Sequence, residues 1–100
     1  MRQVIVRYRV KPDRAEENAR LIEAVFAQLA REAPAGLRYA SFRGPDGCDF
    51  THLAIMEDGP NPLLALDSFR AFTAAIRDRC EEAPVNVEVT EVGAYRMARG

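Results

Sequence analysis

The sequence predicts an α+β fold: a four-stranded antiparallel sheet with two helices on one face. Apolar residues follow a two-residue period, then a helical period, in the order strand, helix, strand, strand, helix, strand. This order is the split βαβ, or ferredoxin-like, arrangement. The expected strands are apolar on both faces, whereas two helices cover only one face. We therefore expect a homodimer in which a second copy covers the other face of the sheet.

The first strand is expected from about Gln3 to Val10, where apolar residues alternate, and Pro12 ends it. A helix is expected from Asp13 to about Arg31, because apolar residues recur every three or four positions and acidic residues lie in its first turn. Pro34 and Gly36 close this helix. Its apolar stripe comprises Ile22, Val25, Phe26 and Leu29.

A hairpin is expected in the middle of the chain. Alternation returns from Leu37 to Arg43 and from Phe50 to Glu57, and the Gly44–Gly47 segment between these runs is rich in turn residues. The second of these strands is apolar on both faces. Phe50, His52, Ala54 and Met56 share one side, and Leu53 and Ile55 share the other.

The last third of the sequence predicts three elements: an irregular turn at Leu63–Leu66, a helix from Asp67 up to Pro84, and a strand from Val85 to about Tyr95. The alternation changes phase between Val89 and Val92, which indicates either a bulge or a strand whose second half packs against a different part of the protein. The apolar stripe of the helix is Phe69, Phe72, Ile76 and Cys80.

Right-handed crossovers place the first and third strands at the centre of the sheet. The alternation assigns one set of apolar side chains to the helix-facing side of the sheet. This assignment places His52 on the opposite, partner-facing side, and a slip of one residue in register would exchange the faces. The residues assigned to the helix-facing side are Val4, Val6, Tyr8, Phe42, Leu53 and Ile55.

Composition narrows the function classes. One hundred residues with 48% hydrophobic content predict one domain, residues 1–100. The 14 basic and 15 acidic residues are interspersed, which argues against nucleic-acid binding. We expect no membrane span, no signal peptide and a cytoplasmic location. Cys48 and Cys80 lack the spacing of a metal site, so we expect unpaired thiols and no metal.

His52 is the one histidine of the chain and the first candidate for chemistry. It is either a general base or hydrogen-bond donor, or a structural histidine of the core or interface. The rings of Tyr8 and Tyr39 either pack against the sheet with the hydroxyl at its edge, or their hydroxyls reach into a pocket. Arg38 and Arg43 either neutralise an anionic ligand or pair with carboxylates across strands. Phe69 and Phe72 lie on the apolar stripe of an amphipathic helix, which favours a core role over a cofactor site.

Four segments resemble the antibiotic biosynthesis monooxygenase-like domains of the dimeric α/β-barrel superfamily, whose uncharacterised bacterial members are common. These segments are Val6–Pro12, Gly36–Tyr39, the strand-end Glu57 and Ser68–Phe72. The resemblance implies a homodimer with face-to-face sheets and a small apolar pocket between sheet and helices. Unlike many members, this chain has no Trp, and it has no His in the segment 60–66.

The resemblance implies a cofactor-independent monooxygenase acting on a small hydrophobic or aromatic compound. His52 or Tyr39 would then transfer the proton, and Arg43 or Arg38 would stabilise the anion. Tyr8, Phe42, Phe69 and Phe72 are the further residues expected to contact a ligand. The alternative is a non-catalytic ligand-binding or dimerisation domain on the same fold. An enclosed cavity lined by His52 or a tyrosine hydroxyl favours the enzyme.

Overall fold

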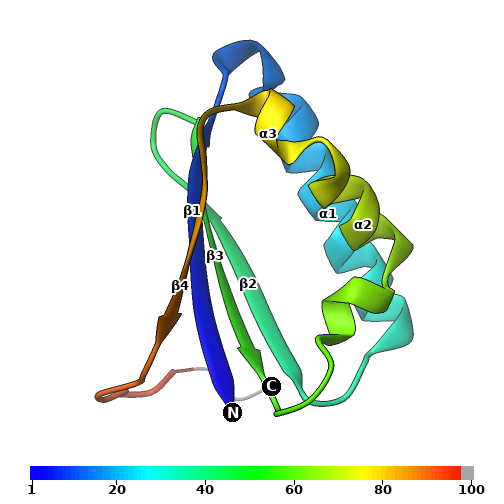
Figure 1. Cartoon of the computed structure of the whole chain (residues 1–100), viewed down its shortest axis with the longest axis vertical. Coiled ribbons are helices and arrows are strands. Elements are labelled where there is room, and N and C mark those ends of the chain that lie inside the picture. Colours follow the sequence, from blue (N-terminus) through cyan, green and yellow to red (C-terminus); the bar gives the residue numbers. More distant parts are fainter. Residues whose placement is uncertain (98–100) are drawn as a thin grey trace.

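The computed structural model of the chain describes residues 1–97 and confirms the α+β, ferredoxin-like fold (Figure 1). Four antiparallel strands form one sheet in the order β2-β3-β1-β4, so the first and third strands are central, as predicted. The elements are β1 (Arg2–Val10), α1 (Ala15–Glu32), β2 (Leu37–Arg43), β3 (Asp49–Met56), α2 (Asp67–Ala74), α3 (Ile76–Arg79) and β4 (Cys80–Val89).

Two short 3-10 helices lead into the longer helices. The first, η1 (Pro12–Arg14), occupies the expected start of the first helix, so α1 begins at Ala15 rather than at Asp13. The second, η2 (Pro62–Ala65), is the irregular turn that the sequence predicts before α2. The Asn61 side chain accepts a hydrogen bond from the Leu63 backbone N–H at 2.9 Å and stabilises the start of this turn.

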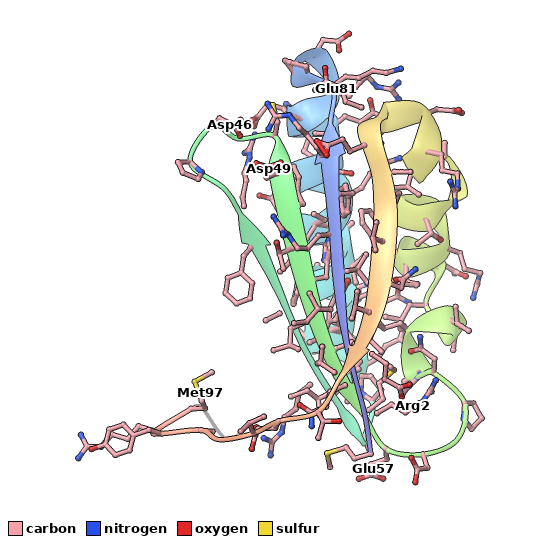
Figure 2. The ribbon with its side chains drawn as sticks, turned by 60° about the vertical axis from the view of Figure 1, so that its left-hand side comes forward. Arg2, Asp46, Asp49, Glu57, Glu81 and Met97 are labelled. Carbon is pink, nitrogen blue, oxygen red and sulfur yellow. The ribbon has the colours of Figure 1, made fainter. Side chains whose placement is uncertain are left out.

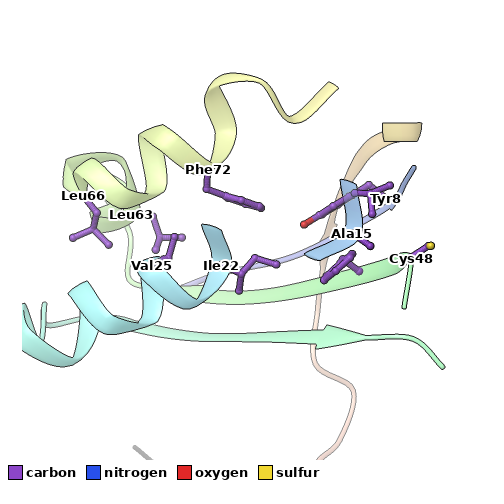
Figure 3. Packing of buried hydrophobic residues seen from close by; sticks show 10 residues of the cluster. Tyr8, Ala15, Ile22, Val25, Cys48, Leu63, Leu66 and Phe72 are labelled. Atoms are coloured by element: carbon purple, nitrogen blue, oxygen red, sulfur yellow. The ribbon is translucent and has the colours of Figure 1, made fainter. Parts of the chain in front are cut away.

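All the helices lie against one face of the sheet, and the other face is uncovered in the single chain (Figure 1). The core fills the space between the two layers, where Val25 and Ile22 from α1 and Phe72 from α2 point toward the sheet (Figure 3). Val10 and Val25 are 0% and 1% exposed, so the centre of this layer excludes water. No helix among residues 1–97 is long and apolar enough to cross a membrane.

The predicted second helix is shorter than expected. It ends at Ala74, the single turn α3 follows, and Cys80 begins β4 instead of belonging to a helical stripe. Cys80 pairs with Val10 of β1, and the Lys11 backbone N–H donates to the Arg79 carbonyl at 2.8 Å. Pairing with a central strand therefore outweighs the helical period of the sequence at this point.

The last strand also differs from the prediction. It ends at Val89, so Tyr95 lies beyond the sheet and is exposed. The register with β1 shifts twice near the beginning of β4, between Cys80 and Glu82 and between Glu82 and Val85, rather than between Val89 and Val92. Pro84 lies in this irregular part, and proline is typical of such interruptions in a strand.

The prediction of which β3 side chains point toward the helices was wrong. Val6 pairs directly with His52, and directly paired residues of antiparallel strands share a face, so His52 points toward the helices together with Val6. The prediction was correct for Val4, Val6 and Tyr8, which occupy the helix-facing side. It was wrong for Phe42, Leu53 and Ile55, which lie on the open face. Because β3 is apolar on both sides, its alternation alone does not distinguish them.

The open face carries charged residues at both ends of the sheet (Figure 2). At one end, the Arg9 guanidinium contacts Asp46 at 2.7 Å, Asp49 at 3.1 Å and Glu81 at 3.3 Å. Glu57 lies at the opposite end of the sheet (Figure 2), and Arg38 occupies the open face next to it. The part of the face between these ends is mainly apolar.

Candidate functional site

A cavity of about 390 Å³ lies between the sheet and the helices. Its wall is mainly apolar and aromatic, and it receives side chains from all four strands and from α2 and α3. A pocket of this size and lining is typical of a small-molecule site. The apolar and aromatic residues of the wall include Val4, Val6, Tyr8, Tyr39, His52, Ala54, Met56, Leu63, Phe69, Phe72 and Ile76.

His52 lies in the wall of this cavity, stacked between two tyrosine rings. The ring centroids of Tyr8 and Tyr39 lie 5.4 Å and 5.9 Å from that of His52, and the ring planes deviate by only 9° and 13°. Phe72 from α2 covers the histidine, with centroids 5.5 Å apart. The imidazole is only 3% exposed. Three neighbouring strands therefore hold the ring from both sides, and a helix covers it.

Both nitrogens of the imidazole have hydrogen-bond partners within the protein. Nε2 lies 2.8 Å from the Tyr8 hydroxyl. Nδ1 lies 2.5 Å from the Ser41 hydroxyl and 3.1 Å from the Tyr39 hydroxyl. Burial lowers the pKa of His52 to about 4, because desolvation disfavours the charged ring. His52 is therefore neutral at neutral pH, with one nitrogen donating and the other accepting.

The hydrogen bonds continue from Tyr8 into the core. The Asn18 amide nitrogen donates to the Tyr8 hydroxyl at 2.9 Å, and the Arg79 Nε donates to the Asn18 carbonyl oxygen at 3.0 Å. Arg79 also donates through Nη2 to the Phe72 carbonyl at 2.6 Å, in the last turn of α2. Asn18 and Arg79 are 0% and 1% exposed. We call Arg79, Asn18, Tyr8, His52, Ser41 and Tyr39 the His52 network.

The phenols of the network stay protonated at neutral pH. Burial raises the pKa of Tyr8 above its usual value, although the hydrogen bond from Asn18 opposes the rise. Burial also raises the pKa of Tyr39 to about 12, and a hydrogen bond with Ser41 partly opposes that shift. The two tyrosine hydroxyls can therefore donate hydrogen bonds, but they are not anionic bases.

The structure brings five of the eight predicted site residues together around the cavity: Tyr8, Tyr39, His52, Phe69 and Phe72. Arg38, Phe42 and Arg43 lie elsewhere. Phe42 is 60% exposed on the open face, and Arg38 lies on the same face, opposite Ile55. Neither residue lines this cavity, because alternation along β2 turns both away from it.

Arg43 is the last residue of β2 and does not line the cavity. Its guanidinium contacts Glu16 at 2.5 Å and donates to the Gly47 carbonyl at 2.8 Å, so it pairs with a carboxylate of α1. Cationic side chains do reach the cavity, but from other elements: Arg2 of β1 and Arg77 of α3.

The sequence reasoning missed Asn18, Ser41 and Arg79. A signal existed for two of them. Asn18 precedes Ile22 and Val25 by four and seven positions, so it lies on the apolar stripe of α1, where a polar residue is unusual. Arg79 follows Phe72 and Ile76 by seven and three positions and continues the stripe of the second predicted helix. Residues 1–97 contain no group of three His, Cys, Asp or Glu side chains that could hold a metal ion.

Several proteins of known structure share this architecture. No protein-family model and no curated protein matches the chain. Among solved structures, a putative antibiotic biosynthesis monooxygenase from Nitrosomonas europaea is similar, with a TM-score of 0.73 and 18% sequence identity. The match covers 93% of this chain and 100% of that chain. PA3566 from Pseudomonas aeruginosa matches with 92% and 94% coverage, a TM-score of 0.72 and 17% identity.

A variant of SnoaB, a cofactor-independent oxygenase from Streptomyces nogalater, is similar as well. It covers 96% of this chain and 97% of its own, with a TM-score of 0.68 and 18% identity. Each match spans nearly the whole of both chains, so the likeness covers the complete sheet and its helices. The chain therefore has the fold of antibiotic biosynthesis monooxygenase-like proteins, and the resemblance noted in its sequence is confirmed at the level of the fold.

Proposed function

We propose that the protein is a monooxygenase that oxidises a small hydrophobic, aromatic compound without a metal or an organic cofactor. One observation carries the proposal: a buried histidine flanked by two phenols lines a cavity with aromatic walls. The structural likeness to SnoaB, described as a cofactor-independent oxygenase, supports it. We further propose that the protein acts in the cytoplasm, where the free thiols of Cys48 and Cys80 remain reduced.

The reaction requires a substrate that supplies its own electrons. An activated CH₂ group between aromatic rings loses a proton, and the carbanion transfers an electron to O₂. The resulting radicals combine, and the peroxide takes up a proton to give a hydroperoxide. Loss of water leaves a ketone, so that CH₂ and O₂ become C=O and H₂O. The protein must therefore accept a proton, stabilise an anion and exclude bulk water.

The His52 network supplies groups for these tasks. His52 is the proton acceptor, and because both of its nitrogens already have partners, the proton reaches it through a tyrosine hydroxyl. Protonated phenols in a desolvated wall are strong donors to an enolate oxygen. Phe69 and Phe72 pack against the aromatic body of the substrate.

We propose that the functional unit is a homodimer joined through the open faces of the two sheets. Four side chains from four strands, Ala40, Leu53, Ile5 and Val87, form an apolar row across this face. The next row adds Phe42 and Val85, each 60% exposed in the single chain, with Thr51 and Arg7 between them. An exposed apolar strip of this kind needs a partner, and a second copy offers a matching surface with charges of both signs at its ends.

A non-catalytic ligand-binding domain is the second candidate, and one observation favours it. Both nitrogens of His52 are occupied by internal hydrogen bonds, and the lowered pKa makes the ring a weak base. A purely structural network would have the same contacts. Under this alternative the cavity binds an aromatic compound and leaves it unchanged.

Oxygen uptake distinguishes the two candidates. We expect consumption of O₂ with at least one member of a panel of anthrones and polycyclic phenols, and loss of this activity in His52→Ala and in Tyr39→Phe. Tyr95→Phe is the matched control, because Tyr95 is 79% exposed and lies outside the cavity. Absence of uptake with the whole panel contradicts the enzyme. Equal uptake by the parent and His52→Ala removes the histidine from the mechanism.

A further inference from the structure

The hydrogen bonds between Arg79 and His52 all run in one direction, which the Arg79 side chain determines. Arginine has only donor groups, so the Asn18 atom that meets Arg79 Nε at 3.0 Å is the carbonyl oxygen. The amide nitrogen of Asn18 then faces Tyr8 and donates to its hydroxyl oxygen at 2.9 Å. The Tyr8 proton is left to bind Nε2 of His52 at 2.8 Å. Every hydrogen bond from Arg79 to His52 therefore points the same way.

This direction selects one tautomer of the histidine. Since Nε2 accepts a proton from Tyr8, the proton of the neutral ring resides on Nδ1. Nδ1 lies 2.5 Å from Ser41 Oγ and donates to it. The Tyr39 hydroxyl lies 3.1 Å from the same nitrogen. It cannot donate to Nδ1, because the nitrogen that carries the ring proton has no free lone pair.

The Tyr39 hydroxyl proton is then not used by His52. Because Nδ1 carries a hydrogen, the Tyr39 hydroxyl cannot donate to that nitrogen, and its proton is available to an acceptor in the cavity. Tyr39 lines the cavity, whereas Ser41 does not. The unused donor is therefore presented to whatever occupies the cavity.

Burial of a guanidinium without a salt bridge is generally unfavourable, which indicates a specific role for Arg79. It is 1% exposed, and no carboxylate among residues 1–97 forms a salt bridge with it. The carbonyl of Phe72 near the end of α2 and the face of the Phe72 ring, 5.6 Å away, stabilise the charge in part. A buried cation without a paired carboxylate is unfavourable unless it organises polar partners.

We propose that Arg79 is a positioning residue that acts through Asn18 and Tyr8 to hold His52 in its Nδ1–H form, so that the Tyr39 hydroxyl donates to an acceptor oxygen of the ligand. The ligand class is thereby narrowed to aromatic compounds with a carbonyl, enolate or phenolate oxygen. The statement about the ligand rests on the proposed function, whereas the statement about the tautomer does not.

The tautomer can be measured directly in the free protein. His52 is the one histidine of the chain, so its ring nitrogens are assigned without ambiguity in a long-range ¹H–¹⁵N spectrum. At pH 7 we expect a pyrrole-type shift for Nδ1 and a pyridine-type shift for Nε2. The reverse pattern, or averaged shifts that indicate a mixture, overturns the proposal.

Two substitutions test the cause of the tautomer. Asn18→Asp replaces the amide donor by an acceptor that still pairs with Arg79, so the Tyr8 proton turns to the carboxylate and His52 changes to the Nε2–H form. Arg79→Met removes the donor that orients Asn18 and should give a mixture of tautomers, whereas Arg79→Lys should restore the parent form. If Arg79→Met fails to fold, the Asn18→Asp result decides. An unchanged tautomer in Asn18→Asp overturns the role of the network.

Ligand binding tests the role of Tyr39. We expect 1-acetonaphthone, which has a carbonyl, to bind the parent about three- to tenfold more tightly than 1-ethylnaphthalene, the range for one hydrogen bond. Tyr39→Phe should remove this preference, and Tyr95→Phe should retain it. A preference that survives in Tyr39→Phe overturns the assignment. Failure of both probes to bind refutes the ligand assignment and leaves the measured tautomer standing, whereas oxygen uptake with the panel of anthrones and polycyclic phenols decides the proposed function separately.

Discussion

The Tyr8 hydroxyl lies 2.8 Å from Nε2 of His52, and the two rings stack with their centroids 5.4 Å apart. Tyr8 belongs to β1 and His52 to β3, and the two residues are diagonal neighbours across the central pair of strands. The contact therefore joins the candidate site to the most buried part of the sheet. Changes that disturb it are expected to affect stability as well as chemistry.

The stability of the protein should depend on pH through His52. The ring of the unfolded chain binds a proton below about pH 6.5, whereas burial lowers the pKa in the folded chain to about 4. Between these values the unfolded state holds more protons, so the free energy of unfolding decreases as the pH falls. The expected loss attributable to His52 is on the order of 3 kcal/mol over this window.

Urea unfolding of the parent and of His52→Gln, at one protein concentration from pH 7 to pH 4, measures this effect. The variant lacks the titrating ring, so its unfolding free energy should fall less than that of the parent. Carboxylates titrate in both proteins, and the comparison cancels their contribution. Parallel curves for the two proteins would show that the histidine is not held in its neutral form.

Removal of the Tyr8 hydroxyl should destabilise the protein more than removal of the Tyr39 hydroxyl. Tyr8→Phe leaves both the Asn18 amide and His52 Nε2 without a buried partner, at a cost of about 1–3 kcal/mol. Tyr39 is less buried, and Ser41 keeps a bond to Nδ1 in Tyr39→Phe. Denaturant unfolding of the two variants gives the comparison, and equal losses would contradict the different burial of the two hydroxyls.

Filling the cavity should weaken binding of aromatic compounds. Ala54 lies in the wall on β3, and Ala54→Leu places a larger side chain in the space that the ligand needs. Ala74→Leu on the exposed side of α2 is the control with the same chemical change. In a fluorescence titration with 1-acetonaphthone, we expect at least tenfold weaker binding for the first variant and unchanged binding for the second. Equal affinities would place the ligand outside this cavity.

A charge on the open face should separate the proposed dimer. Leu53→Glu introduces a carboxylate into the apolar row that crosses the sheet, where burial against a second copy would leave it unpaired. Sedimentation should give a particle of about twice 11.2 kDa for the parent and of 11.2 kDa for the variant. Ala24→Glu on the exposed side of α1 is the control and should remain a dimer. A monomeric parent would refute the proposed assembly.

The order of the elements was predictable because it depends only on local periodicity. Alternation in β1 and β2, the stripe of α1 and the turn residues between the strands each determine a local conformation, and their order is sufficient for the topology. Tyr8, Tyr39, His52, Phe69 and Phe72 were identified by residue type and strand position. The placement of these five around one cavity agrees with that selection.

The side of the sheet that His52 occupies was decided by the tertiary structure. Both faces of β3 are apolar, so only the register with Val6 of β1 turns the imidazole toward the helices. Pairing of Cys80 with Val10 ended the second helix early and fixed the position of Arg79 next to Asn18, sixty-one positions away in sequence. Periodicity describes what each segment prefers by itself, whereas register and burial depend on contacts between segments that are distant in the chain.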